Sequence, residues 1–134
     1  MKATVTWAGE ELFLAQSESG HSLVLDANGG KTAPSPLENV LLSLGSCSSV
    51  DVVSILQKAR QKITDCRVEI DATRVDSVPR LFSDIHLHFV ITGTDVAAKH
   101  VERAVSLSAD KYCSVALMLN KTVKITHDFE IVEA

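Results

Sequence analysis

The chain has 134 residues, 46% of them hydrophobic, and a formal net charge of −4 at pH 7. A chain of this length buries about two-thirds of the surface that it exposes when unfolded, which is enough for a core without disulfides. Length and composition therefore predict one globular domain over residues 1–134. No basic stripe is present to neutralise phosphates, which argues against a nucleic-acid partner.

The N-terminus alternates polar and apolar residues and lacks the apolar run of a signal peptide. We also expect no segment of membrane-spanning length, and hence a cytoplasmic protein without a membrane partner. The three cysteines, Cys47, Cys66 and Cys113, would be reduced at rest in that compartment. Their spacing matches neither a CxxC redox pair nor a zinc ribbon, so we expect no metal and no bound cofactor.

The segment over residues 35–61 is predicted to be the central helix. Ser35 can cap it, Pro36 fits its first position, and Glu38 stands three residues after the cap. Its apolar residues fall on nearly every side of a helical wheel, which is typical of a buried helix. One small sheet cannot cover such a helix, so we predict that a second copy of the chain does so in an intimate homodimer.

The remaining pattern predicts strands before and after this helix. Three strands are expected within residues 2–26, and a glycine loop at 28–31 is explained by turn chemistry. Later elements are two strands, over 66–73 and 85–91, a helix carrying 101–108 that is capped near Asp95, a break near 108–110 and a last strand over 123–131. Strands grouped as hairpins around a very apolar helix predict an α+β fold.

The cysteines occupy three different settings in this pattern. Cys47 lies in the middle of the central helix among serines, where a free cysteine is either a small core residue or a reactive thiol. Cys113 stands where a short helix begins, and that position, with Lys111 nearby, favours a thiolate. Cys66 alternates onto the apolar face of a strand, which favours a structural role.

Histidines offer a weaker signal. His86 and His88 share one strand face, but no third ligand lies close in sequence, so a solvated face explains them better than a metal site. His127 falls on an inner face, where it could be a hydrogen-bonded core histidine.

Two motifs together resemble the OsmC/Ohr superfamily, in particular its YhfA-like branch. They are Ser-Pro-Leu-Glu leading into the apolar helix with Cys47, and the distal Tyr-Cys-Ser-Val-Ala-Leu-Met-Leu with Cys113. The resemblance implies antiparallel sheets packed around a long buried central helix in an intertwined homodimer. It also implies a thiol-dependent hydroperoxide reductase that acts on small organic hydroperoxides, with Cys47 as peroxidatic cysteine, Cys113 as resolving cysteine, Glu38 as active-site glutamate and an external dithiol as reductant.

The chain departs from the family pattern at two places. No arginine occurs between Met1 and Pro36, where family peroxidases place the one that holds the thiolate ionised, and Ser114 replaces the proline that usually follows the distal cysteine. Two alternatives on the same fold therefore stay open: a non-catalytic protein that binds a small apolar molecule, and a thiol redox sensor.

Glu38 and Cys47 are nine residues apart, which is about 180° around a straight helix. Either Gly45 bends the helix, or Glu38 serves the cysteine of the partner subunit. We favour the second, because it needs the same dimer that the apolar helix demands.

Overall fold

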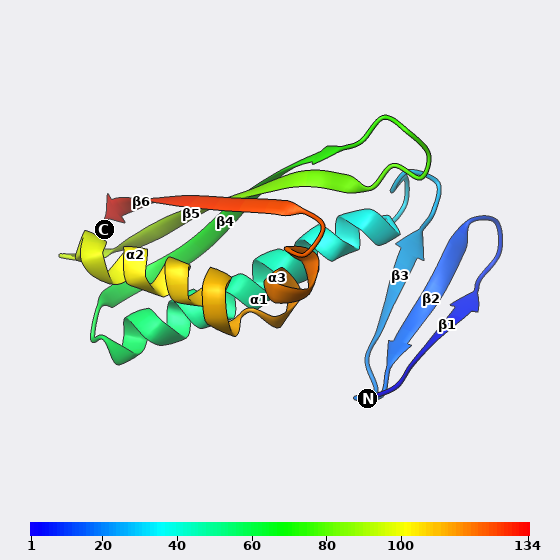
Figure 1. Cartoon of the computed structure of the whole chain (residues 1–134). Coiled ribbons are helices and arrows are strands. Elements are labelled where there is room, and N and C mark those ends of the chain that lie inside the picture. The colour runs from blue at the N-terminus through cyan, green and yellow to red at the C-terminus, as the bar shows by residue number, and fades with distance from the viewer. The chain divides into compact units, whose positions relative to one another are not determined.

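The computed structural model describes all residues, 1–134 (Figure 1). In chain order the elements are β1 (Ala3–Trp7), β2 (Leu12–Ser17), β3 (Ser22–Asp26), α1 (Pro36–Lys58), β4 (Lys62–Arg74), β5 (Phe82–Thr94), α2 (Ala98–Leu107), η1 (Ser108–Tyr112), α3 (Ser114–Leu119) and β6 (Lys124–Glu133). The chain divides into two compact units, Met1–Leu42 and Ser43–Ala134, which are described separately. That both belong to one domain stays a prediction.

The first unit holds an antiparallel sheet of order β1-β2-β3. Gly9 and Gly20 occupy the two turns with φ of 98° and 90°, a backbone conformation that favours glycine. The three strands expected within residues 2–26 are confirmed. Apolar side chains of this sheet remain exposed, among them Val5 at 62% and Trp7 at 67%.

The loop after β3 is organised by the buried carboxylate of Asp26. It accepts hydrogen bonds from the backbone N–H of Asn28 (2.8 Å), the backbone N–H of Thr32 (2.8 Å) and the hydroxyl of Thr32 (2.7 Å). These bonds, that of the Thr32 hydroxyl above all, hold the pKa of Asp26 below its usual value. Turn chemistry therefore explains the loop, as expected.

A capping box starts α1. The hydroxyl of Ser35 accepts from the N–H of Glu38 at 3.1 Å, and Oε1 of Glu38 accepts from the N–H of Ser35 at 3.0 Å. The capping signature read from the sequence is confirmed. Gly30 packs directly against the Glu38 carboxylate, leaving no room for a side chain at residue 30.

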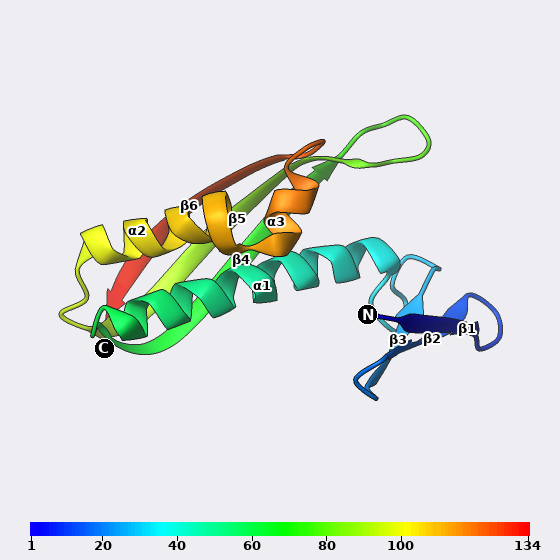
Figure 2. The same cartoon turned by 60° about the horizontal axis from the view of Figure 1, so that its bottom comes forward.

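The second unit holds a mixed sheet of order β4-β5-β6. Strands β4 and β5 are antiparallel, but β5 and β6 are parallel, with Leu87 opposite His127. The expectation of purely antiparallel sheets is wrong here. The segment between β5 and β6 is a crossover through α2, η1 and α3, and such a crossover returns the chain in the parallel direction. In Figures 1 and 2 the helices of this unit lie on one face of its sheet.

The core of the second unit lies between that sheet face and the helices. Fully or almost fully buried apolar residues are Leu44, Val52 and Leu56 of α1, Ile85, Leu87, Phe89 and Ile91 of β5, and Val101, Ala104 and Val105 of α2. The strand predicted over residues 85–91 is therefore confirmed, and its alternate residues form the inner face of the sheet. Gly45 lets α1 approach β4 closely, since a Cβ there would lie 2.7 Å from Cδ1 of Ile70.

Helix α1 is buried along one stripe and not on all sides within a single chain. Its buried residues are Leu44, Gly45, Ser48, Val52 and Leu56, about one per turn, whereas Val50 is 67% exposed. By length and composition this helix could also cross a membrane, contrary to our expectation that no segment reaches that length. Core helices of water-soluble proteins satisfy the same criteria, so the observation is weak evidence for a membrane span.

Two details between β5 and α3 differ from the expected ones. Helix α2 follows Ala97 without a side-chain cap, because Asp95 has a φ of 52° and its N–H bonds to Glu133 instead. The break expected near 108–110 is a π-helical turn that continues from α2. The interruption comes at Cys113, whose backbone is extended with φ of −75° and ψ of 103°.

Candidate functional site

Cys47 and Cys113 meet in the core of the second unit. Cys47 lies on the middle turn of α1 and is half-buried, while Cys113 precedes α3 and is fully buried. The side chain of Cys47 lies near that of Cys113, close enough to raise the pKa of the Cys113 thiol. Sγ of Cys113 also accepts from the hydroxyl of Ser48 and from the N–H of Ala116, both at 3.4 Å. The fold thus joins the two cysteines that the sequence singled out.

Burial raises the pKa of the Cys113 thiol, and the neighbouring Cys47 raises it further. The bonds from Ser48 and Ala116 act in the opposite direction but do not outweigh burial. Our expectation that a helix start favours the Cys113 thiolate is therefore wrong. Lys111 does not assist, because its ammonium lies over the ring of Tyr112, 5.5 Å from the centroid. The fold therefore disfavours the thiolate of Cys113.

A second serine supports this arrangement from the π-helical turn. The hydroxyl of Ser108 donates to Oδ2 of Asp51 at 2.9 Å and approaches the carbonyl oxygen of Ser48 at 3.3 Å. Ser48 and Ser108 are 2% and 1% exposed, and both line a cavity of about 80 Å³ that His127 also borders. Sequence reading missed Ser108, since a π-helical turn leaves no periodicity signal.

Cys66 stands apart from the pair. It lies on β4, half-buried, and hydrogen-bonds the hydroxyl of Ser49. Burial, with the charge of Asp65, raises the pKa of the Cys66 thiol. These features agree with the structural role predicted for it.

Glu38 has a structural task in the first unit, where its carboxylate completes the capping box. Cys47 and Cys113 belong to the second unit. A catalytic role of Glu38 stays a prediction.

A cleft of about 490 Å³ lies beside α1, and some of its lining residues are close in sequence to Cys47 and Cys113. Its lining is Asp51, Ser54, Ile55, Lys58, Ala59, Arg103, Leu107 and Tyr112. On α1 these residues follow the stripe that begins at Cys47, one turn before Asp51, and Tyr112 immediately precedes Cys113. Neither Lys58 nor Arg103 forms an ion pair, so the mixed polar and apolar lining of the cleft holds two free cations together with the carboxylate of Asp51.

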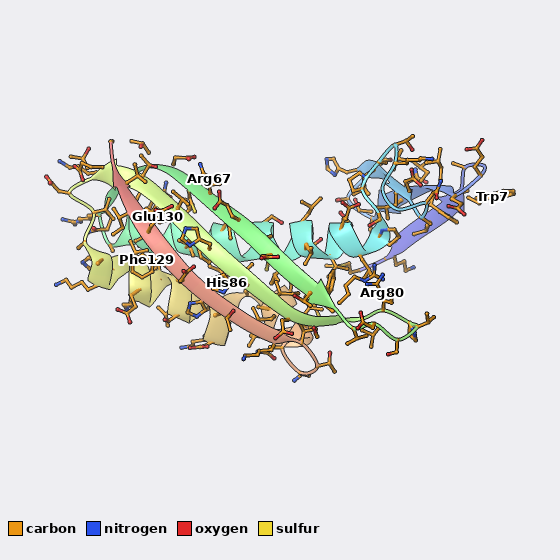
Figure 3. All side chains as sticks on the ribbon, turned by 90° about the horizontal axis from the view of Figure 1, so that it is seen from above. Trp7, Arg67, Arg80, His86, Phe129 and Glu130 are labelled. Carbon is orange, nitrogen blue, oxygen red and sulfur yellow. The ribbon has the colours of Figure 1, made fainter.

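His86 lies on the sheet face opposite the helices (Figure 3), and His88, two residues further along β5, shares that face. Asp128 of β6 pairs with both rings, at 2.9 and 2.7 Å, and Glu130 pairs with His88 at 3.2 Å. Asp128 is the largest cause of the raised pKa of His88, and His88 lowers the pKa of Asp128 in return. No group of three or more His, Cys, Asp or Glu in the chain is arranged to hold a metal. The solvated strand face expected from the sequence is the better description.

Comparison with known proteins identifies the family of the chain. The family model described as OsmC-like protein matches residues 28–128. The chain is 54% identical over 134 residues to Protein YhfA of Escherichia coli (strain K12), which covers 100% of both chains.

Solved structures share the fold. A hypothetical protein from Aquifex aeolicus is 29% identical, with a TM-score of 0.90 over 99% of this chain and 96% of its own. The organic hydroperoxide resistance protein OhrB of Bacillus subtilis is 17% identical, with a TM-score of 0.66 over 97% and 98% of the two chains, a likeness of fold alone. On the family match and the full-length identity, this chain belongs to the family of OsmC-like proteins.

Proposed function

We propose that this protein is a thiol-dependent hydroperoxide reductase that serves in defence against peroxide stress. The observation that supports this most directly is that the fold brings Cys47 near the buried Cys113 thiol, whose pKa it raises. The family and the fold shared with an organic hydroperoxide resistance protein support the same reading. Cys47 is the peroxidatic cysteine, because it is the less buried of the two and so the one that a substrate can reach.

In the first step the Cys47 thiolate attacks one peroxide oxygen and the O–O bond breaks. The sulfur loses two electrons and becomes a sulfenic acid, while the leaving alkoxide takes a proton and departs as an alcohol. An organic hydroperoxide is favoured over hydrogen peroxide, since an alkyl group gains free energy when it leaves water.

In the second step Cys113 condenses with the sulfenic acid. An S–S bond forms, the S–O bond of Cys47 breaks, and hydroxide leaves with the proton of the Cys113 thiol as water. An external dithiol then reduces the disulfide by thiol exchange and is itself oxidised, which restores both thiols. This cycle needs no bound cofactor.

The working form is a cytoplasmic homodimer in which a second copy covers the open side of α1. Val50 is 67% exposed on that side, and Val53 beside it is half-buried. Burial of such an apolar face is a favourable term in association. In this dimer Glu38 serves the cysteine pair of the partner subunit. A heterodimer of one Cys47→Ser chain and one Glu38→Gln chain tests this, because it keeps one complete site, and hence partial peroxidase activity, only if Glu38 acts across the dimer.

The proposal is tested by mixing the purified protein with cumene hydroperoxide and a dithiol. Peroxide is expected to be consumed, Cys47→Ser to abolish consumption, and Cys113→Ser to let the sulfenic acid accumulate. Cys66→Ser is the matched control and keeps turnover. If the Cys47→Ser variant turns over as fast as the wild type, the peroxidase assignment is wrong.

Glu38→Gln separates the two roles of this residue. Glutamine also completes a capping box, so the free energy of unfolding is expected to stay unchanged. Turnover falls if the carboxylate serves the thiol. Unchanged turnover with unchanged stability would leave Glu38 a capping residue only.

A ligand-binding protein is the second candidate, and the cleft beside α1 favours it. Its apolar side chains, among them Ile55 and Leu107, and the free cations Lys58 and Arg103 suit a small molecule with an apolar body and an acidic group. Native mass spectrometry of freshly purified protein would support this candidate by detecting a retained small molecule on a protein whose Cys47 does not react with peroxide.

A thiol redox sensor is favoured by a different observation. No cation is among the causes that shift the pKa of Cys113, so the disulfide would form slowly. Disulfide formation over minutes, with no turnover at a tenfold excess of dithiol, would favour the sensor.

A further inference from the structure

Ser48 contacts Cys113, the proposed reaction partner of the neighbouring Cys47. It follows Cys47 directly on α1, and its hydroxyl donates to Sγ of Cys113 at 3.4 Å, with both residues at most 2% exposed. We propose that Ser48 is a positioning residue for Cys113, which holds the sulfur toward Cys47 and stabilises its thiolate when it attacks. This inference rests on the proposed function in taking Cys113 as the resolving cysteine.

The need for such a residue follows from the burial of Cys113. A thiolate is the attacking species in disulfide formation, and burial disfavours it. Around Cys113 the titratable groups are Cys47 on α1, Asp51 through Ser108, Asp110, Lys111 and Tyr112 on η1, and His127 on β6. None of the cations among them bonds to the sulfur, so its stabilisation falls to neutral donors.

Two donors reach the sulfur, and they differ in kind. The N–H of Ala116 belongs to the backbone and is present whatever side chain stands there. The hydroxyl of Ser48 is the one side-chain donor, and both lower the pKa of Cys113. Only the Ser48 bond can therefore be removed by substitution.

Ser48 is itself held in place. Its backbone belongs to the buried stripe of α1, and the hydroxyl of Ser108 approaches its carbonyl oxygen at 3.3 Å. A donor that is already ordered loses little side-chain freedom when the thiolate forms. Two neighbouring residues of α1 thus have complementary roles: the sulfur of Cys47 is attacked, and the hydroxyl of Ser48 donates to the attacking sulfur of Cys113.

The step itself balances without a new reactant. Cys113 gives up its proton and its sulfur attacks the sulfur of the Cys47 sulfenic acid. The S–O bond breaks, and the hydroxide leaves with that proton as water. The Ser48 hydroxyl keeps its own proton throughout and only donates a hydrogen bond.

Ionisation of Cys113 is the decisive measurement. Protein labelled with ¹³Cβ-cysteine gives one signal per cysteine, assigned with Cys→Ser variants, and each signal moves when its thiol ionises. Removing a hydrogen bond to a charged group costs enough to move a pKa by about one unit. Ser48→Ala is therefore expected to move the Cys113 titration up by about one pH unit, leaving about tenfold less thiolate at a given pH.

Matched variants give this result its meaning. Ser49→Ala removes the neighbouring hydroxyl, which bonds Cys66, and is expected to leave the Cys113 titration in place. Ser48→Thr keeps the hydroxyl and is expected to titrate near the wild type. If the small cavity left by alanine prevents folding, Ser48→Thr and Ser48→Val form a second pair of equal size that differs in the hydroxyl. The proposal is overturned if the pKa of Cys113 in Ser48→Ala equals that of the wild type, or if Ser48→Val and Ser48→Thr give the same Cys113 pKa.

The kinetics of disulfide formation complete the test. After one equivalent of cumene hydroperoxide, Ser48→Ala is expected to form the Cys47 sulfenic acid at the wild-type rate but the disulfide about tenfold more slowly. A shifted titration without peroxide consumption would refute the peroxidase and keep the role of Ser48. Peroxide turnover with an unmoved titration would refute the role of Ser48 alone.

Discussion

Gly45 is the residue at which packing of α1 against the sheet can be tested most directly. A Cβ at this position would lie 2.7 Å from Cδ1 of Ile70 and 3.3 Å from Cγ1 of Val68. Overpacking of this kind costs typically about 1–3 kcal/mol, and we expect a cost near the middle, about 2 kcal/mol, because the new Cβ meets both Ile70 and Val68. Alanine in place of glycine returns about 1 kcal/mol through helix propensity. Gly45→Ala is therefore expected to lower the free energy of unfolding by about 1 kcal/mol.

A double-mutant cycle with Ile70→Val isolates the contact. That substitution removes Cδ1 and by itself costs about 1 kcal/mol. In its background Gly45→Ala is expected to be neutral or stabilising, which gives a coupling of about 1–2 kcal/mol. Urea unfolding measures each corner of the cycle. Ser43→Ala, on the exposed side of the same helix, is the control and is expected to show no coupling with Ile70→Val.

The same variant links packing to the proposed chemistry. Gly45 lies two residues before Cys47, so a helix displaced from β4 is expected to slow the Cys47–Cys113 disulfide. The reasoning is refuted if Gly45→Ala stabilises the wild-type protein by about 1 kcal/mol and its effect simply adds to that of Ile70→Val.

Three further predictions concern caps and charges. Ser35→Ala removes half of the capping box and is expected to cost about 1 kcal/mol in urea unfolding, whereas no loss would mean that the box contributes nothing. The pKa of Asp26 is lowered in the fold, so Asp26 stabilises the protein above the pKa that it has in the unfolded chain, and this stabilisation is lost as pH falls through the folded pKa. Asp26→Asn should therefore have a lower free energy of unfolding than the wild type at pH 7, and the two free energies should become equal in acid. The pKa of His88 is raised and that of Asp128 lowered, so their pairing stabilises the fold from about pH 4 to pH 6.5 and fades as pH rises through the pKa of His88. His88→Gln should therefore differ most from wild type near pH 5.5, and a difference that grows toward pH 9 would contradict this.

Much of the secondary structure could be predicted from local pattern. Alternation marked the first three strands and the inner face of β5, and Ser35 and Glu38 marked the start of α1. Such signals are readable because side-chain period and capping depend on neighbours in sequence. The cap assigned to Asp95 failed because the β5–α2 turn gives that residue a positive φ, which no local pattern announced.

The candidate site divides in the same way. Sequence alone identified Cys47, Cys113 and Glu38 as the residues to examine, and it excluded a zinc ribbon by spacing. Only the tertiary structure decided that Cys47 and Cys113 lie near each other, that Ser48 and Ser108 support Cys113, and that burial raises the pKa of the Cys113 thiol. The physical reason is that a pKa and a contact depend on burial and on groups brought from distant parts of the chain, here α1 and the turn before α3. Spacing in a sequence does not determine either quantity.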